Sequence, residues 1–590
     1  MILEFLAVIL ILLCILSGSV LLCSMGKCSF SDALPLTFIA VAFINYIFGL
    51  FGALQLGFIL TMLCAAAAYC AAVYFIIKNR DIKKPAVGRD ISPLIIFTAL
   101  SLILLFLNYG KLLASWDEFS HWGDVVKMMT TLNVLSTSPA SDSLFPEYPP
   151  AMALFQYFAE KLYMLITGSR MAEWLLYYSY QLFMFSLYFP LIKKLNLKKL
   201  SSYLYLAVLF LLPTVFQHEV YSKIYIDPFL SSAFAVLLGT IVLSQEHNTL
   251  YYIKVFSFLA LLTITKTLGI LLAVIAFIVF IIYEPQKKID SFKLFGFLSV
   301  LIPALSWQIN VKLSASKAAF NLAEIKSVSS EYSSAVLGRY FKLLTSNTYT
   351  SSEALCPQLP FILFFIIIIG ALFLSLYLHG KERPICKKRN FTLFTILLLF
   401  DILFIIGLGF AYVYVFSSSE AETMTEASRY INNLLMADSL LSVFCFISLA
   451  DAKNKFVIPA ALLAAVLLFT PLQSTARFLL RREVLYSQTF RAPYDSVTEK
   501  LIEASASDLK DKNIIIATES TDAMDYMVFR TSLRPASVVM YYIPGDEDKL
   551  SDMLVSEEYD YLAVFEVNEP IAVESRYTDL LNNGDIYSLR

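Results

Sequence analysis

The segment SWDEFSHWGD, residues 115–124, gathers polar residues that are rare elsewhere in this chain. It holds the adjacent acids Asp117 and Glu118, a third acid at Asp124, one of four histidines and two of four tryptophans. An ionised carboxylate can take the proton of an attacking hydroxyl group and so act as a general base. The same acids can instead be solvated or cap a helix whose N-terminus favours negative charge. Tryptophan also suits a membrane–water interface, so this segment alone leaves both interpretations open.

Three other short segments place ionisable residues between apolar runs. HEVYSKIYIDP (218–228) includes His218 and Asp227, TITKTLG places Lys266 inside a long apolar stretch, and EASRYINNLL places Arg429 where an apolar run begins. An ionisable residue within a membrane span is a functional hypothesis by default, although a lysine can also extend to the lipid headgroups. Lys and Arg can stabilise the charge that develops on a leaving phosphate. The combined set therefore suits transfer of a group away from a phosphate at the edge of a bilayer.

The composition predicts the elements that must position these residues. The 590-residue chain is 58% hydrophobic and 16% charged, whereas a soluble domain is about 25% charged, and its mean hydropathy is +0.69. Apolar runs recur at about the length that crosses a bilayer as a helix. We expect an all-α polytopic membrane protein with about fourteen transmembrane helices. The predicted spans are 1–23, 33–53, 57–77, 92–108, 172–192, 202–217, 228–244, 250–264, 268–283, 292–311, 359–379, 391–415, 431–450 and 455–472.

The basic residues predict the orientation of these spans. They concentrate in five short loops, which all fall on one side of the predicted topology, and short basic loops are typical of the cytoplasmic side. These loops are 78–90, 193–199, 284–293, 380–389 and 451–455. The large loop 109–171, the other polar segments and the N-terminus then lie outside a plasma membrane. The first apolar run lacks a basic start and a clear cleavage site, so we interpret it as a retained helix.

The tail after residue 472 differs in character from the rest of the chain. Segments 513–518 and 559–567 read as short buried strands, and helices are expected from near Ser496 and over 521–533. This order predicts a small extracytoplasmic α/β domain over 473–590, without a glycine-rich phosphate loop. The eight cysteines form no C-x-x-C pair, so we expect neither a disulfide framework nor a metal knuckle. No nucleic-acid partner is expected.

These polar segments carry a resemblance to a known family. Their order and sidedness over about residues 92–472 resemble the GT-C superfamily of integral-membrane glycosyltransferases, which use polyprenyl-phosphate-linked donors. The branch with protein O-mannosyltransferases and the aminoarabinose transferase of lipid A is most similar. That branch carries an acidic motif, often Asp-Glu, in its first large outer loop. The resembling motifs are WDEFSHWGD, FPEYPPAMALFQYF (145–158), YIDPFLSSAFA, TITKTLG and SRYINNLL.

The resemblance implies roles for individual residues. Asp117 would be the general base on an acceptor hydroxyl with Glu118 as its partner, or the reverse, because neighbouring carboxylates titrate as a pair. Lys266 and Arg429 would hold the donor phosphate, and Asp227 would bind a sugar hydroxyl or a divalent cation. Four further residues are assigned to substrate binding: His121, Trp122, Tyr148 and His218. No ligand spacing is compelling for a metal, so a divalent cation stays an option and no metal site is assigned.

The family pattern and this chain also differ. The family usually places its acidic loop after the first span, whereas here the loop follows about four, so residues 1–91 are interpreted as an N-terminal extension of about three helices. The acceptor would be an extracytoplasmic glycan, lipid or protein. A lipid-linked glycan transporter or flippase, a polysaccharide polymerase or ligase, and a non-catalytic scaffold are the alternatives. A transporter tends to carry repeated halves with charges near the bilayer midplane, and neither is evident in this sequence.

Overall fold

The computed structural model covers most of the chain. It describes residues 2–26, 28–78, 91–284, 291–314, 328–346, 350–356, 358–449, 456–506, 508–543, 547–556, 558–572 and 580–589. Three of the five basic loops, 78–90, 284–293 and 451–455, lie wholly or mostly outside the described residues.

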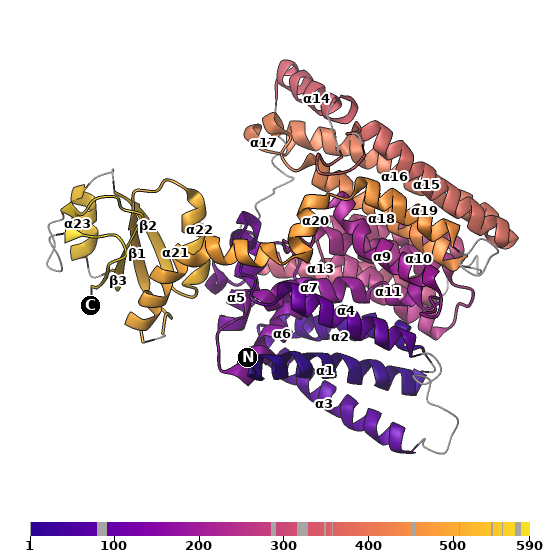
Figure 1. The fold of residues 1–590 in the computed structure, drawn as a ribbon, viewed down its shortest axis with the longest axis horizontal. Coiled ribbons are helices and arrows are strands. Elements are labelled where there is room, and N and C mark those ends of the chain that lie inside the picture. Colours follow the sequence, from indigo (N-terminus) through magenta and orange to yellow (C-terminus); the bar gives the residue numbers. More distant parts are fainter. Residues whose placement is uncertain are drawn as a thin grey trace.

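Helices occupy most of every predicted span (Figure 1). A helix satisfies all of its backbone hydrogen bonds internally, which is why apolar runs adopt it in lipid. The first group is α1 (Ile2–Gly26), α2 (Phe30–Leu50), α3 (Leu54–Lys78), α4 (Ser92–Asn108), α7 (Glu173–Ser186), α8 (Phe189–Ile192) and α9 (Leu200–Phe216). The second group is α10 (Asp227–Leu243), α11 (Thr249–Thr263), α12 (Thr267–Tyr283), α13 (Ser291–Leu313), α15 (Phe361–Glu382), α16 (Lys387–Tyr414), α18 (Ala427–Ser448) and α19 (Val457–Phe469).

Among the described residues, seven helices are long and apolar enough to cross a membrane: α1, α2, α3, α13, α15, α16 and α18. An eighth results if α19 and α20 (Leu472–Leu479), which meet at a bend of 100°, count as one span. Five apolar helices are shorter, namely α4, α9, α10, α11 and α12. The predicted all-α, multi-pass architecture therefore holds, whereas fourteen spans are not confirmed by helix length and composition.

The remaining helices lie in the loops. They are the π-helical turn η2 (Glu118–Trp122), α5 (Gly123–Leu132), η3 (Pro139–Ser141), α6 (Ala151–Thr167), α14 (Ser330–Thr345), η4 (Pro384–Cys386) and α17 (Ser418–Thr423). The predicted loop 109–171 is thus largely helical. Its helices α5 and α6 pack against each other. In addition, α5 packs against η2, and α6 packs against α7.

The centre of the membrane part is the pair α10 and α18, which pack along each other. Almost every residue of both helices is buried, because neighbouring helices surround them (Figure 1). The two helices begin at the same end of the bundle, where Asp227 of α10 meets Arg429 of α18. The start of α1 lies at this end too, since Tyr109, which follows α4, donates a hydrogen bond to Glu4 at 2.7 Å. Chain direction and packing therefore bring together residues far apart in sequence.

The C-terminal part forms an α/β unit beside the bundle (Figure 1). Its four-stranded sheet has the order β2-β1-β3-β6, with β1 parallel to β2 and β3, and β6 antiparallel to β3. The elements are α21 (Arg482–Ala504), β1 (Asn513–Thr518), α22 (Ala523–Ser532), β2 (Ser537–Tyr542), α23 (Glu547–Val555), β3 (Tyr561–Phe565), β4 (Ile571–Ala572), β5 (Leu580–Leu581) and β6 (Ile586–Ser588). β4 pairs with β5 in a separate two-stranded sheet.

Both predicted strands of the tail are present as β1 and β3, and the predicted second helix is α22. The first helix was predicted to begin near Ser496, but α21 begins at Arg482. The reason is that α21 also serves as the connection from α20 to the sheet, so its first half packs on the membrane part. Leu112 of the loop 109–171 donates a backbone hydrogen bond to Ser487 at 3.1 Å, and Gln488 donates to the carbonyl of Gly110 at 2.8 Å.

Candidate functional site

Asp227 is the buried centre of a charged cluster at the common end of α10 and α18. It is 1% exposed, and a buried charge requires partners that compensate its loss of hydration. Lys266 provides one at 2.7 Å from Oδ1, and the side-chain amide of Asn433 donates a second contact at 2.7 Å. The Nε of Arg429 lies 3.8 Å from Oδ2. Three of the five predicted charged residues of the site are therefore in direct contact.

Arg429 connects this buried acid to the loop 109–171. Its Nη1 lies 3.0 Å from Oδ2 of Asp117, another of the predicted residues, and its Nε lies 3.3 Å from Glu426. The guanidinium group also lies over the rings of Tyr225 and Tyr430, at 5.0 and 5.7 Å from the centroids. Cation–π contacts of this kind hold an arginine side chain in place. One guanidinium group thus bridges two carboxylates that belong to different segments.

A helix break positions Lys266. The residue precedes α12 in extended conformation, after α11 has ended at Thr263. The break is tight, since a Cβ atom on Gly269 would lie 1.9 Å from the carbonyl oxygen of Leu262. The backbone N–H of Ala151 donates a hydrogen bond to the carbonyl of Ile264 at 2.9 Å, which ties the break to the loop 109–171. Glycine is required here because the two backbone segments approach too closely for any side chain.

Glu118 has a different environment from its neighbour Asp117. It is 1% exposed, and its oxygens accept hydrogen bonds from four groups: the backbone N–H groups of Ala114, Ser115 and Ile224 and the hydroxyl of Tyr177, at 2.7–3.2 Å. Burial raises the pKa of this carboxyl above its usual value. Because all of these partners belong to the protein, Glu118 holds the loop to α7 and to the 218–227 turn. Asp117, by contrast, keeps a side chain 33% exposed.

His121, Trp122 and Tyr148 form an aromatic group beside the charged cluster. The ring of His121 lies 4.5 Å from that of Trp122 and 4.8 Å from that of Tyr148, centroid to centroid. Burial lowers the pKa of His121 to about 3, so its imidazole stays neutral at physiological pH. Tyr148 is close enough to Asp117 and Arg429 to interact with them electrostatically. The group therefore forms an uncharged wall next to the cluster.

His218 lies apart from these residues. It is exposed, and the charged groups that act on it are Glu353 and Glu219. The structure thus brings together eight of the nine predicted residues, directly or as neighbours in the same loop, and leaves His218 at the surface. Sequence reasoning did not single out Asn433, Tyr225 or Tyr430. Two of these lie in SRYINNLL, where the paired asparagines inside an apolar run were the available signal.

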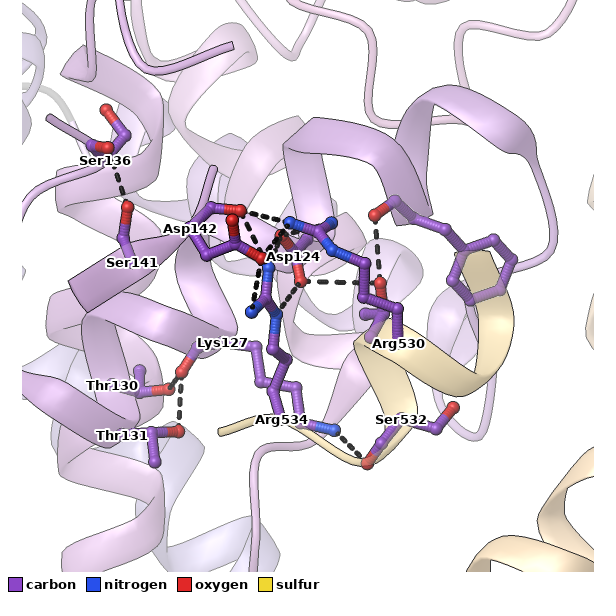
Figure 2. A network of polar contacts seen from close by, with 12 residues as sticks. Asp124, Lys127, Thr130, Thr131, Ser136, Ser141, Asp142, Arg530, Ser532 and Arg534 are labelled. Atoms are coloured by element: carbon purple, nitrogen blue, oxygen red, sulfur yellow. Dashed lines mark hydrogen bonds and ion pairs between the residues drawn. The ribbon is translucent and has the colours of Figure 1, made fainter. Parts of the chain in front are cut away.

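The third acid of the opening segment, Asp124, connects the loop to the C-terminal domain (Figure 2). It is fully buried. Arg530 donates to it from Nη1 at 3.2 Å, and Arg534 donates from Nε at 3.0 Å and from Nη2 at 3.3 Å. Asp142 completes the group, with its carboxylate 3.4 Å from each arginine. We call these four residues the arginine clamp, and it fixes the helix that directly follows η2.

The donor set does not fit a divalent cation well. Among the described residues, no group of three or more His, Cys, Asp or Glu side chains is arranged to hold a metal ion. Asp227, the predicted candidate, already contacts Lys266, and a second positive charge would be repelled there. The cluster is instead suited to an anion that approaches Arg429 and Lys266, whose side chains are 17% and 16% exposed.

Comparisons with known proteins give no family assignment. No protein-family model matches the chain, and no curated protein sequence matches it.

Proposed function

We propose that the protein is a membrane glycosyltransferase of the GT-C type, which transfers a sugar from a polyprenyl-phosphate donor to an extracytoplasmic acceptor. The observation that carries this proposal is the contact of Asp117 with Arg429 beside the buried Asp227–Lys266 pair. It combines an accessible carboxylate and two cations at one end of a bundle of apolar helices. That end is where the phosphate of a lipid-linked donor would lie.

In the proposed reaction, the acceptor hydroxyl oxygen attacks the anomeric carbon of the donor sugar. The bond from that carbon to the phosphate oxygen breaks, and its electron pair stays on the departing lipid phosphate. The carboxylate of Asp117 accepts the hydroxyl proton. Lys266 and Arg429 stabilise the negative charge on the phosphate, as charge-assisted hydrogen bonds do most strongly in a site with little water.

The same geometry separates the roles of the two aspartates. Asp227 is buried and paired with Lys266 at 2.7 Å, so we assign it to holding both cations rather than to contacting sugar or metal. Asp117 is the accessible acid. An anionic phosphate at Arg429 competes with Asp117 for the guanidinium group, which frees this carboxylate for the acceptor hydroxyl. Donor binding and activation of the base are thereby linked.

The topology belongs to the same proposal. All fourteen predicted segments, including the five shorter apolar helices, enter the membrane, and the cluster and the C-terminal domain face outward from a plasma membrane. The support is that the outer loop, the 218–227 turn, Lys266 and the start of α18 meet at one end. The basic residue Lys193 contacts Asp32 near the start of α2, in a separate charged group that also includes Lys254.

The test is consumption of polyprenyl-phosphate sugars by the purified protein in lipid vesicles, with a panel of donor sugars and mixed glycan acceptors. The native protein is expected to consume one donor, and Asp117→Asn to be slower by at least about 10²-fold, the lower range for loss of a general base. Binding of that donor should persist in the variant. Asp142→Asn, which changes an exposed acid of the same outer loop, should keep the native rate.

Two results would contradict the proposal. One is a native protein that consumes no donor while a lipid-linked glycan crosses the same vesicles, which would identify a transporter. The other is full turnover by Asp117→Asn, which would remove the assigned base.

A further inference from the structure

A polar cavity of about 520 Å³ adjoins the charged cluster. It lies between residues 111–118 of the outer loop, the 219–223 turn and the helices α20 and α21. This volume is within the range of about 300–1,000 Å³ that small-molecule sites occupy. Its lining includes the buried residues Lys111 and Glu118. Most ligand pockets are lined mainly by apolar side chains, so the polar lining here indicates a hydrophilic ligand.

The charges that line the cavity leave an excess of positive charge. Lys223 is paired with Glu219, and Arg477 is paired with Glu483 at 3.3 Å. Lys111 and Glu118 attract each other. Arg482 is exposed, and no ion pair of its side chain is found among the described residues. The cavity therefore favours an anionic ligand.

Two aromatic side chains flank the same cavity. Trp116 is 44% exposed and Tyr486 is 59% exposed, and both line it. An aromatic ring that is both amphipathic and accessible can pack on the C–H face of a sugar ring while charged neighbours bind the hydroxyl groups. Exposed rings within a charged lining are thus suited to a carbohydrate ligand.

The cavity is physically connected to the cluster. The Nζ atom of Lys223 lies 5.5 Å from the ring centroid of Tyr225, and the guanidinium group of Arg429 lies 5.0 Å from the same centroid. In the chain, Asp117 lies between Trp116 and Glu118, which both line the cavity. A ligand in the cavity would therefore lie next to the proposed base, on the side of the C-terminal domain.

We propose that this cavity binds the acceptor, and that the acceptor is an anionic glycan bearing a carboxylate or phosphate group. The role of the cavity as an acceptor site rests on the proposed function, whereas its binding of an anionic glycan does not. Trp116 and Tyr486 are the stacking residues, and Arg482 contacts the anionic group. The C-terminal domain thereby gains a role, because α21 supplies one wall of the acceptor site.

The experiment measures binding without any donor. Native protein in lipid nanodiscs is titrated with trigalacturonate and, separately, with neutral maltotriose, by calorimetry and by tryptophan fluorescence. We expect trigalacturonate to bind at least tenfold more tightly than maltotriose. Tyr486→Ala and Arg482→Ala should each weaken trigalacturonate binding by about tenfold or more. Trp116→Phe should abolish most of the fluorescence change while calorimetric binding persists. Leu485→Ala, the adjacent exposed residue of α21, should match the native protein.

The inference is overturned if trigalacturonate does not bind, if both sugars bind equally, or if Tyr486→Ala and Arg482→Ala bind like the native protein. Donor consumption, measured separately as above, tests the proposed function. Glycan binding in a protein that consumes no donor would retain the cavity as a glycan site and remove the glycosyltransferase assignment. Donor consumption without the expected glycan binding would retain the glycosyltransferase assignment and remove the cavity as a glycan site.

Discussion

Replacement of Asp124 by asparagine is expected to release the C-terminal domain from the loop 109–171. The carboxylate accepts three hydrogen bonds from Arg530 and Arg534 at 3.0–3.3 Å, and its side chain is 1% exposed. The two guanidinium groups have side chains only 3% and 4% exposed. Asparagine keeps one acceptor oxygen and the shape of the side chain, but it leaves two buried cations without their principal counter-charge.

The magnitude follows from this burial. Breaking a buried ion pair by removing one partner costs about 3–5 kcal/mol. We expect the lower end, about 3 kcal/mol, because the carbonyl and carboxylate of Asp142 still accept hydrogen bonds from both arginines. That free energy lowers the ratio of docked to undocked domain by about two orders of magnitude. In nanodiscs, the larger population of undocked domain should appear as faster amide hydrogen exchange in α5 and α22.

Asp142→Asn is the matched control. This side chain is 76% exposed, so its ion pairs are screened by water and contribute about 0–1 kcal/mol, and its backbone carbonyl is unchanged. Equal exchange rates in Asp124→Asn and Asp142→Asn would refute the reasoning, since they would mean that burial of the clamp does not determine its strength. Faster exchange confined to α22, with α5 unchanged, would show that the loop does not need the clamp.

Two other predictions concern the loop and the helix break. Gly269→Ala should lower stability by at least about 3 kcal/mol, the upper range for overpacking, because the new Cβ would lie 1.9 Å from the carbonyl oxygen of Leu262. Gly370→Ala, where a Cβ meets nothing within 4 Å, should change stability by no more than about 1 kcal/mol, and similar thermal unfolding of the two variants would contradict this. Glu118→Gln should lose about 1–3 kcal/mol at neutral pH, because its amide group opposes backbone donors, while turnover per folded molecule persists. Since burial raises the pKa of Glu118, the part of its stabilisation that depends on protonation is fully present below the unfolded-state pKa and is lost as the pH rises through the folded-state pKa. The loss of stability in Glu118→Gln should therefore be larger at acidic than at neutral pH, and a native-minus-variant difference that stays flat with pH would exclude this.

The membrane architecture was predictable because it depends on local composition. A run of apolar residues long enough to enter a bilayer forms a helix whatever its neighbours are, since its backbone polar groups have no other partners there. The strands β1 and β3 were predictable for a similar reason, as short and continuous apolar runs within a polar domain. The start of α21 was not, because its first half is polar and is held by contacts with the loop near Gly110 and Leu112.

The sequence was sufficient to predict which residues belong to the candidate site, but not which of them contact each other. Charged residues are rare in this chain, so Lys266, Arg429 and Asp227 were evident wherever they interrupted apolar sequence. The contacts between these residues could not be inferred from the local sequence. Arg429 and Asp117 are 312 positions apart in the chain.

The sequence by itself determined that this protein is a bundle of apolar helices with a small α/β domain, and it identified the few polar residues available for chemistry. Local composition is sufficient for both conclusions. The tertiary structure alone decided the roles of the three acids in SWDEFSHWGD. Asp117 reaches Arg429, Glu118 is enclosed by donors of its own loop and its neighbours, and Asp124 binds two arginines of the C-terminal domain. Adjacent residues of a helical turn point in different directions, so each acid meets a different part of the chain, and that partner defines what the acid can do.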